Sequence, residues 1–369
     1  MYNIRVRSGV LPLFRHLTSV PTAPFREKAV SRKVLKWIAK NLGSRVTVRK
    51  FRGGLVVSYR GAGKGPALAL AAHLDHPAFR LEKVTRKGAA AFLQGGLPPH
   101  LLPGAEIEAF PAVPKNNIPL ARGVIGLPPK PGGLWSISWT VPPKRGSKPV
   151  FAVLSLTPYE VKDGWLSSRS IDDLLGCAVA LEAMRRLVAA KAKTNLNVLL
   201  NRAEEVGFIG ALDMIRSGVL SVADSYLSIE SSREMTGSRP GKGPTIRLGD
   251  KATAFDPNLL ALLDSAAERL KKKGALIQRL RLTGGTCEAT AYLAFGFESA
   301  GVAVPLVNYH NGWGAKAVAP ERVRVSDAEG AVLILVETAR QFPSKILRGA
   351  LRARLTARRA LASRALAIG

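Results

Sequence analysis

The chain has 369 residues, of which 47% are hydrophobic, so it can bury a sizeable core and is longer than one compact domain usually is. No apolar run of about 18 residues occurs, and residues 1–50 interleave Arg and Lys with short apolar stretches, which argues against a membrane span and a signal peptide. The 55 Lys and Arg against 26 Asp and Glu give a net charge of +29, but these cations are spread out and accompany no known nucleic-acid-binding motif, which disfavours a nucleic-acid partner.

The first part of the chain predicts the start of an α/β domain and then an interruption. Residues 13–42 have apolar side chains at helical spacing, residues 53–60 read as a strand, and residues 66–75 form a nearly continuous apolar strand of the kind buried in a parallel sheet. Between residues 85 and 163, short strand-like pieces are broken by Pro-Pro, Gly-Gly and Pro-Gly pairs. We predict that residues 85–163 form a small β-barrel-like domain inserted into the first.

Alternation of strands and helices returns after the insert. Helices are predicted at 170–191, 207–217, 257–273, 288–295 and 328–341, and strands at 195–202, 225–230, 277–282 and 301–308. A mostly parallel sheet covered by helices explains this order, with residues 1–84 and 164–344 as one discontinuous domain. Residues 345–369 mix Arg with Leu and predict a basic amphipathic helix outside that domain.

Acidic and histidine side chains follow the apolar strands of this sheet. Open α/β sheets bind ligands at the carboxyl ends of their strands, so these side chains are expected in one crevice. The groups at strand ends are His73, Asp75, Glu204, Glu205, Glu230 and His310, and Asp172 stands where a helix begins.

Taken singly, each of these residues has an ordinary structural explanation. Considered alone, Asp172 is better explained as a helix N-cap, Glu230 as a capped loop carboxylate and His310 as a satisfied interior histidine, and only their combination favours a metal site. His73 and Asp75 share a face of their strand, so Asp75 can accept the second ring N–H of the imidazole or hold neighbouring groups. His76 points to the opposite face of an ideal strand and is left out of the ligand set.

The adjacent pair Glu204 and Glu205 is harder to explain without a cation, because two carboxylates repel each other in a dry crevice. Imidazole and carboxylate ligands suit zinc, cobalt or manganese, and two such ions can share a bridging carboxylate and a bridging water. We assign Asp172 as the bridge, with His73 and Glu230 on one ion and Glu205 and His310 on the other, although the sequence leaves open which ligand belongs to which ion. Glu204 is then the general base that activates the water.

The only cysteines, Cys177 and Cys287, suggest neither a disulfide framework nor a thiolate metal site. Their usage fits a reducing compartment, and we expect a cytoplasmic location. Two divalent ions, with zinc favoured, are the expected cofactors.

Over residues 10–345 the chain resembles the co-catalytic metal aminopeptidases, which include the tetrahedral, deblocking and glutamyl aminopeptidases. The matching motifs are Glu204-Glu205-Val206-Gly207 with Gly210-Ala211, Asp172-Asp173 with residues 176–179, His73-Leu74-Asp75, and residues 123–129 in the insert. The resemblance implies a three-layer αβα, phosphorylase/hydrolase-like catalytic domain that hydrolyses N-terminal residues from peptides. It also implies an insert (85–163) that forms dimers and often twelve-subunit shells, and the ligand, base and orienting roles given above.

The sequence departs from the pattern of this family at several places. His76-Pro77 follows the His-x-Asp motif, Glu230 stands where Asp is typical, and Cys287-Glu288 stands where Asp-Ala is common. Two other functions are left open: an amidohydrolase, such as a deacylase or carboxypeptidase, on the same fold, or a basic scaffold without catalysis. The preferred N-terminal residue, the physiological metal and the oligomer size are not predicted from sequence.

Overall fold

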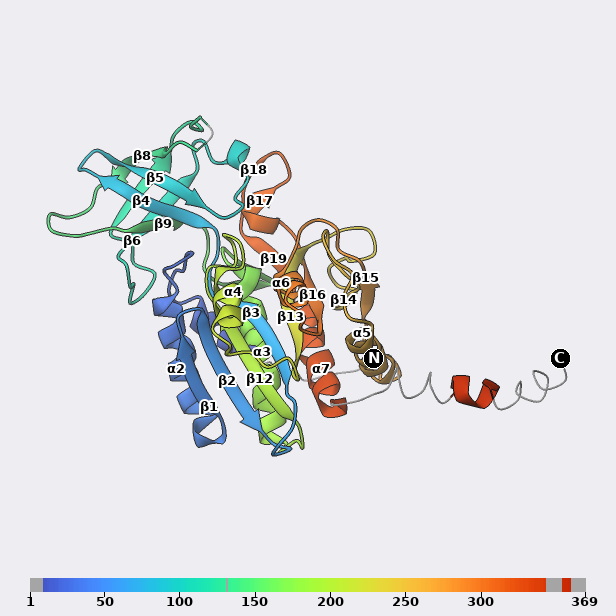
Figure 1. Ribbon diagram of the computed structural model, residues 1–369. Coiled ribbons are helices and arrows are strands. Elements are labelled where there is room, and N and C mark those ends of the chain that lie inside the picture. The colour runs from blue at the N-terminus through green and yellow to red at the C-terminus, as the bar shows by residue number, and fades with distance from the viewer. Residues whose placement is uncertain (1–8, 131, 343–353, 360–369) are drawn as a thin grey trace.

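The computed structural model describes residues 9–130, 132–342 and 354–359, and shows a layered α/β domain with a β-barrel projecting from one end (Figure 1). The central sheet has the strand order β1-β2-β12-β3-β13-β16-β14-β15. Its strands are β1 (Thr47–Phe51), β2 (Gly54–Arg60), β3 (Leu68–His73), β12 (Asn195–Asn201), β13 (Ser225–Arg233), β14 (Thr245–Arg247), β15 (Gln278–Leu280) and β16 (Ser299–Leu306).

The four strands in the middle of the sheet, β12, β3, β13 and β16, run parallel. All residues of β3, β12 and β16 are buried, as expected for strands covered on both faces. β2 and β14 flank them in antiparallel orientation. The parallel strands therefore direct their carboxyl ends to one edge, where the site lies.

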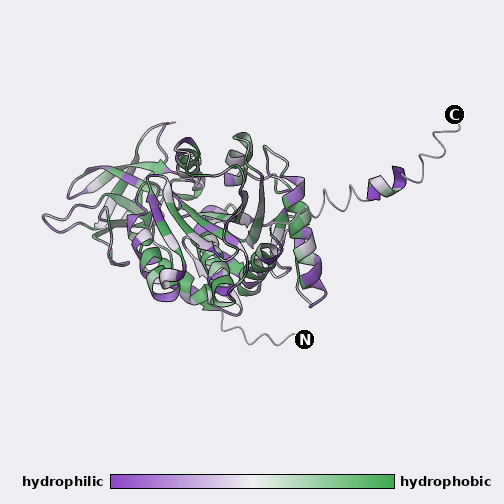
Figure 2. Ribbon diagram, turned by 60° about the horizontal axis from the view of Figure 1, so that its bottom comes forward, coloured by the Kyte–Doolittle hydropathy of each residue, from purple (hydrophilic) through white to green (hydrophobic). Residues whose placement is uncertain are grey.

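Helices cover both faces of this sheet. They are α1 (Val10–Leu17), α2 (Lys28–Asn41), α3 (Ile171–Ala189), α4 (Ile209–Arg216), α5 (Pro257–Lys271), α6 (Glu288–Ala294) and α7 (Val325–Gln341). α1, α2, α3, α5 and α7 share one apolar cluster with Leu68 and Leu70 of β3, whereas α4 and α6 pack with Ala69 and Ala71 on the other face. Successive residues of a strand point to opposite faces, so β3 packs against the helices on both sides of the sheet. Figure 2 shows the hydrophobic residues concentrated where helices and sheet meet.

The projecting unit is a closed barrel with the strand order β4-β5-β8-β7-β6-β9. Its strands are β4 (Ala78–Val84), β5 (Gly88–Gln94), β6 (Glu106–Phe110), β7 (Ala121–Ile125), β8 (Trp135–Val141) and β9 (Phe151–Leu154). Its interior is filled by small and large apolar side chains, among them Phe79, Ile107 and Trp135. Pairing of β4 with β9 closes the barrel and leaves no unpaired edge.

Short strands and turns join the two units near the site. β10 (Glu160–Lys162), β11 (Trp165–Ser168) and β19 (Glu321–Arg324) form a small antiparallel sheet that leads into α3. β17 (Gly312–Trp313) and β18 (Ala317–Val318) form a hairpin after a 3₁₀ turn, η3 (Tyr309–Asn311). The other 3₁₀ turns are η1 (Gly43–Arg45) and η2 (Pro99–Leu101).

The prediction of one helix over residues 13–42 is wrong. Two helices, α1 and α2, are separated by a segment that contains Pro21 and Pro24. Proline lacks the N–H that a continuing helix needs and restricts the residue before it, so the apolar spacing is interrupted there. Strands β1 and β14 and the small sheet were not predicted, because each is short or at an edge and has little apolar periodicity.

The barrel strands run from Ala78 to Leu154, and the sequence analysis placed the insert at 85–163. The predicted helix at 345–369 lies almost entirely outside the described residues; residues 354–359 are helical and exposed. Within the described part of the chain, no helix has both the length and the apolar character that a membrane crossing requires.

Candidate metal centre

One crevice collects the predicted site residues at the carboxyl ends of the parallel strands. His73 ends β3, Glu204 and Glu205 follow β12, Glu230 lies near the end of β13, His310 lies in the turn after β16, and Asp172 lies at the start of α3. Asp172 and the next residue have non-helical backbone angles, so the regular helix begins after them. The start of α3 therefore presents carboxylates and not a capped helical turn.

Asp172 lies between two histidines. Its Oδ1 is 3.5 Å from Nε2 of His73, and its Oδ2 is 3.7 Å from Nε2 of His310. Glu204 Oε2 is 3.7 Å from the same nitrogen of His73, and Glu205 Oε2 is 3.4 Å from that of His310. These N···O distances are longer than those of good hydrogen bonds. Imidazole nitrogens and carboxylate oxygens are the ligand atoms that zinc, cobalt or manganese accepts. A carboxylate with one imidazole at each oxygen has the arrangement of a ligand shared by two ions.

The structure also brings Glu230 to His73, but together with a residue that the sequence analysis left without a role. Possible ligand atoms of His73, Asp173 and Glu230 lie within 4.8 Å of one another. The same holds for His73 with Glu204 and Glu205, and for Asp172 with Glu205 and His310. The predicted ligands thus form one connected group around two centres.

Asp75 connects His73 to the two glutamates. Its Oδ1 and Oδ2 accept hydrogen bonds from the backbone N–H groups of Glu204 (3.0 Å) and Glu205 (3.1 Å). Nδ1 of His73 lies 3.2 Å from the carbonyl oxygen of Asp75 and 3.5 Å from its Oδ1. Because Nδ1 faces only these acceptors, it carries the proton and leaves Nε2 free toward Asp172.

His310 is oriented by the segment that follows the barrel strand β5. Its Nδ1 donates to the carbonyl oxygen of Gly96 over 3.0 Å, which leaves Nε2 directed at Asp172 and Glu205. A Cβ atom on Gly96 would lie 2.7 Å from that Nδ1, so only glycine permits this approach. The inserted unit thereby contributes directly to the geometry of the site.

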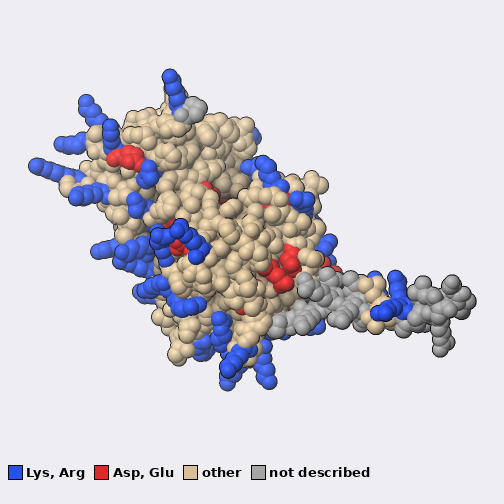
Figure 3. All heavy atoms as spheres, in the orientation of Figure 1, with Lys and Arg blue, Asp and Glu red and all other residues tan. Residues whose placement is uncertain are grey.

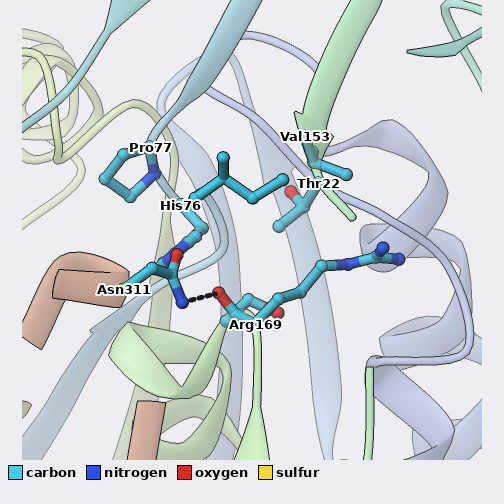
Figure 4. Close-up of a pocket in the computed structure, with 8 residues that line it drawn as sticks. Thr22, His76, Pro77, Val153, Arg169 and Asn311 are labelled. Atoms are coloured by element: carbon cyan, nitrogen blue, oxygen red, sulfur yellow. Dashed lines mark hydrogen bonds between the residues drawn. The ribbon is translucent and has the colours of Figure 1, made fainter. Parts of the chain in front are cut away.

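His76 lies beside the centre but outside the groups that could hold an ion. Its Nδ1 is 2.5 Å from the carbonyl oxygen of Asp172, and its Nε2 is 3.0 Å from Oδ1 of Asn311. Figure 4 shows His76 and Asn311 side by side, with the amide of Asn311 donating to the carbonyl oxygen of Arg169. His76 therefore supports the backbone around Asp172, and the departure at this position does not add a competing ligand.

Burial and neighbouring charges shift the pKa values of the glutamates and histidines in the crevice. Burial raises the pKa of Glu204 well above its usual range and that of Glu230 to about 7, although His73 opposes both shifts. Burial alone would lower the pKa of the histidines, but facing carboxylates outweigh it. Glu204 is the largest such influence on His73, whose pKa rises well above its usual range, and Glu205 is the largest on His310, whose pKa rises to about 9. Metal ligands must be deprotonated, so an arriving cation would displace protons here.

Three buried carboxylate oxygens in the crevice, Asp172 Oδ1, Asp173 Oδ2 and Glu205 Oε1, have no hydrogen-bond partner. Buried charged oxygens without partners are costly, and each of these lies among other acids. Divalent cations would supply both the missing partners and the missing positive charge. The residues present therefore fit a metal centre.

Sequence reasoning missed two carboxylates close to the centre. Glu321 accepts hydrogen bonds from the backbone N–H groups of Asp172 and His310. Glu288, whose pKa burial raises to about 8, accepts from the side chain of Asn201. Both are single acids without a local motif, one at the start of a short strand and one at the start of a short helix, so no spacing in the sequence distinguishes them.

A pocket adjoins the centre on the side of Asp172 and Glu230. Arg233, Arg247, Ser232, Met235, Thr286 and Tyr309 are among the residues that line it. Arg247 is buried and has no hydrogen-bond partner at Nε, whereas its Nη1 donates to Ser232 over 3.4 Å. The pocket can therefore receive a group next to Asp172 and Glu230, and two arginines are among the residues that line it.

The family model of the M42 glutamyl aminopeptidases matches residues 149–318. This segment holds Asp172, Glu204, Glu205, Glu230 and His310. A putative aminopeptidase of Acetivibrio thermocellus is 27% identical over 180 residues, which are 46% of this chain and 50% of that protein. The match thus spans about half the length of this curated relative.

Solved structures of peptidases share the architecture over most of the chain. An aminopeptidase from the archaeon Desulfurococcus kamchatkensis has a TM-score of 0.74 at 21% identity and covers 90% of this chain and 94% of its own. The TET aminopeptidase of a marine sediment Thaumarchaeota archaeon has a TM-score of 0.76 at 17% identity and covers 92% and 99%. The Pyrococcus horikoshii TET1 peptidase, which can assemble into a tetrahedron or a large octahedral shell, has a TM-score of 0.70 at 22% identity and covers 89% and 99%.

At these identities the structural likeness establishes the fold, and the predicted α/β class with an inserted small barrel is confirmed. The match to the family model, taken with these neighbours, also confirms the resemblance that the motifs predicted.

Proposed function

We propose that this chain, which resembles the dinuclear-metal aminopeptidases, is a metal-dependent aminopeptidase that removes N-terminal residues from peptides. The observation that carries the proposal is the carboxylate of Asp172 with His73 at one oxygen and His310 at the other. The ligands are His73, Asp172, Glu205, Glu230 and His310, and two divalent ions are the cofactors. Zinc is favoured, and cobalt or manganese suits the same ligands.

The ions, when bound, would supply Lewis acidity that polarises the scissile carbonyl and acidifies water. Glu204 is the base: its carboxylate lies beside the ligand set, 3.7 Å from Nε2 of His73, and its backbone is fixed by Asp75. It removes a proton from the attacking water and returns it to the leaving amine. The raised pKa of Glu204, caused first by burial, suits a group that must both take and give a proton near neutral pH.

The pocket beside Asp172 and Glu230 is the proposed binding place for the N-terminal side chain of the substrate. Arg247 and Arg233 are among the residues that line it, so their positive charge makes acidic side chains the expected preference. A substrate held in this way would bring its scissile carbonyl toward the residues that would hold the ions, His73, Asp172 and Glu205 among them.

The test is release of p-nitroaniline from Glu, Asp, Leu and Lys p-nitroanilides by chelator-treated protein, before and after addition of zinc, cobalt or manganese. Cleavage that returns with metal supports the proposal, and the fastest substrate identifies the side-chain preference. N-acylated amino acids and peptides with blocked amines serve as comparison substrates. Metal-dependent cleavage of those alone would establish an amidohydrolase, and silence with every substrate would favour a non-catalytic role.

We also propose that the insert, residues 85–163, mediates self-association into dimers and larger shells. Several apolar side chains of this segment are exposed, including Ile118 (73%), Leu127 (80%) and Val141 (52%). Self-association that covers these side chains would remove apolar surface from water, which is favourable. The mass in solution, measured by light scattering, distinguishes a monomer from a dimer or a dodecamer.

A further inference from the structure

Glu321, the first residue of β19, accepts three backbone hydrogen bonds at the edge of the metal centre. Its Oε2 accepts from the N–H groups of Ile171 (2.8 Å) and Asp172 (3.0 Å), and its Oε1 accepts from the N–H of His310 (3.0 Å). The side chain is fully buried. One carboxylate thus connects the segment that carries the shared ligand to the turn that carries the second histidine.

Both segments need an external support, because neither is held by a regular helix or strand at these positions. Asp172 has non-helical backbone angles at the start of α3, and His310 has a positive φ of 51° in the turn η3. A non-glycine residue with positive φ persists only where its surroundings fix it. Glu321 supplies that fixation from a strand that pairs with β11, directly before α3.

A second connection runs parallel to the first. His76 contacts the carbonyl oxygen of Asp172 and the amide of Asn311, and Asn311 donates to the carbonyl oxygen of Arg169 (Figure 4). Residues 169–172 and 310–311 are therefore joined on one side by Glu321 and on the other by His76. Glu321 alone reaches the backbone of both proposed ligands.

We propose that Glu321 is a positioning residue that holds Asp172 and His310 in register, so that together they bind the ion on the His310 side. It contacts neither substrate nor reacting atoms, and it acts through the two ligands. A carboxylate is needed because all three partners are donors and an ionised carboxylate accepts at both oxygens. The proposal rests on the metal-binding part of the proposed function.

The test is Glu321→Gln, with zinc binding measured by competition against a chromophoric chelator. Glutamine has only one acceptor oxygen. Its NH₂ group must therefore face a backbone N–H that the second carboxylate oxygen accepted in the wild type, and two donors cannot form a hydrogen bond. We expect the affinity for the ion on the His310 side, both of whose ligands Glu321 supports, to fall by about 10-fold to 100-fold, as supporting residues of metal ligands usually show. The affinity for the other ion, which shares only Asp172, should fall less. Aminopeptidase activity should fall in limiting zinc and recover in excess zinc, because the reacting groups are intact.

Glu182→Gln is the matched control. Glu182 is also a fully buried glutamate with three N–H donors, but these come from Arg185 and Arg186 on α3. The Glu182→Gln substitution should lower the midpoint temperature of thermal unfolding and leave the affinity for zinc unchanged. If circular dichroism shows that Glu321→Gln does not fold, Glu321→Asp replaces it, since the shorter carboxylate cannot span both segments.

Wild-type affinity for both ions in a folded Glu321 variant would overturn the proposal, as would an equal loss in Glu182→Gln. Failure of the wild-type protein to bind zinc would instead refute the metal centre itself. Tight binding of two ions without peptidase activity would leave Glu321 in its role and refute only the aminopeptidase.

Discussion

The interior and the surface of this protein carry opposite charges. Among the described residues, the buried charged side chains are mostly acidic, whereas Arg169 and Arg247 are the buried cations. The buried acids are Glu27, Asp75, Asp172, Asp173, Glu182, Glu230, Asp250, Glu288, Glu321, Asp327 and Glu329. On the face of Figure 3, by contrast, Lys and Arg greatly outnumber Asp and Glu. A net charge of +29 therefore describes the surface and conceals an acidic centre.

The difference follows from what a carboxylate can do in the interior. It accepts several hydrogen bonds and donates none, so it can gather backbone N–H groups that have no other partner. Asp75 and Glu321 do this around the centre, and Asp327 does it for Gly241 and Gly243. Among the described residues, the buried carboxylate oxygens without a hydrogen-bond partner belong to Asp172, Asp173 and Glu205 in the crevice and to Glu288 close to it, and a cation would supply the missing partner there.

We expect the largest effect when the proposed general base, Glu204, is replaced, and this variant distinguishes a catalytic acid from an acid that is only buried. Glu204→Gln should reduce turnover by about 100-fold to 10,000-fold, because the general base is lost while the shape of the side chain is kept. Rates on the best p-nitroanilide measure the effect, and metal content by elemental analysis checks that both ions remain. Undiminished turnover would remove Glu204 from the mechanism.

Glu27 tests the interior acids outside the ligand set. It is fully buried, and it accepts from the N–H groups of Phe25 and Ala203 and from Nε of Arg202. Glu27→Ala should lower the free energy of unfolding by about 2 kcal/mol, since it removes the acceptor of the N–H groups of Phe25 and Ala203 and of Nε of Arg202, although Arg202 keeps its contact with the carbonyl oxygen of Arg52. Urea denaturation gives the value, and a change below about 1 kcal/mol would contradict this reasoning.

Gly96→Ala tests whether the insert supports the acidic centre. The new methyl group would overlap Nδ1 of His310 and rotate the ring, so zinc affinity should fall by about 10-fold to 100-fold. Gly104→Ala is the control in the same unit: its methyl group meets no atom within 4 Å, and its positive φ of 79° adds a backbone cost that Gly96→Ala does not have, so any effect of strain alone appears there. Equal zinc affinity in the two variants would show that the contact with Gly96 is unimportant.

The smallest effect is expected at the surface. Lys271 and Glu268 form an exposed pair at 3.1 Å on α5. Glu268→Ala should change the free energy of unfolding by less than about 0.5 kcal/mol, because solvent and salt screen such a pair. Urea denaturation again provides the measurement, and a loss as large as that of Glu27→Ala would break the distinction between interior and surface acids.

The sequence predicted the alternating core of the fold because its parallel strands are rich in apolar residues, as buried strands usually are. β3, β12 and β16 stand out for that reason, and the ligands at their ends follow from the geometry of a parallel sheet. The pair Glu204 and Glu205 added a local signal, since two neighbouring acids after a buried strand need an explanation.

What the sequence did not reveal depends on contacts between distant segments. Glu321 belongs to a strand of four residues, and its partners come from α3 and η3. Gly96 acts through its carbonyl group, which no side-chain pattern encodes. Pro21 and Pro24 could have predicted the break between α1 and α2. The helical apolar spacing on both sides of these prolines led instead to the prediction of one continuous helix.

The centre draws its ligands from β3, α3, β12, β13 and η3, and the entire barrel lies between the first two in the chain. Contacts so distant in sequence form late, after the entropy of closing long loops has been overcome. A metal centre built from these segments would be complete only after the sheet and the barrel have come together. Bound metal would then report that both units have folded.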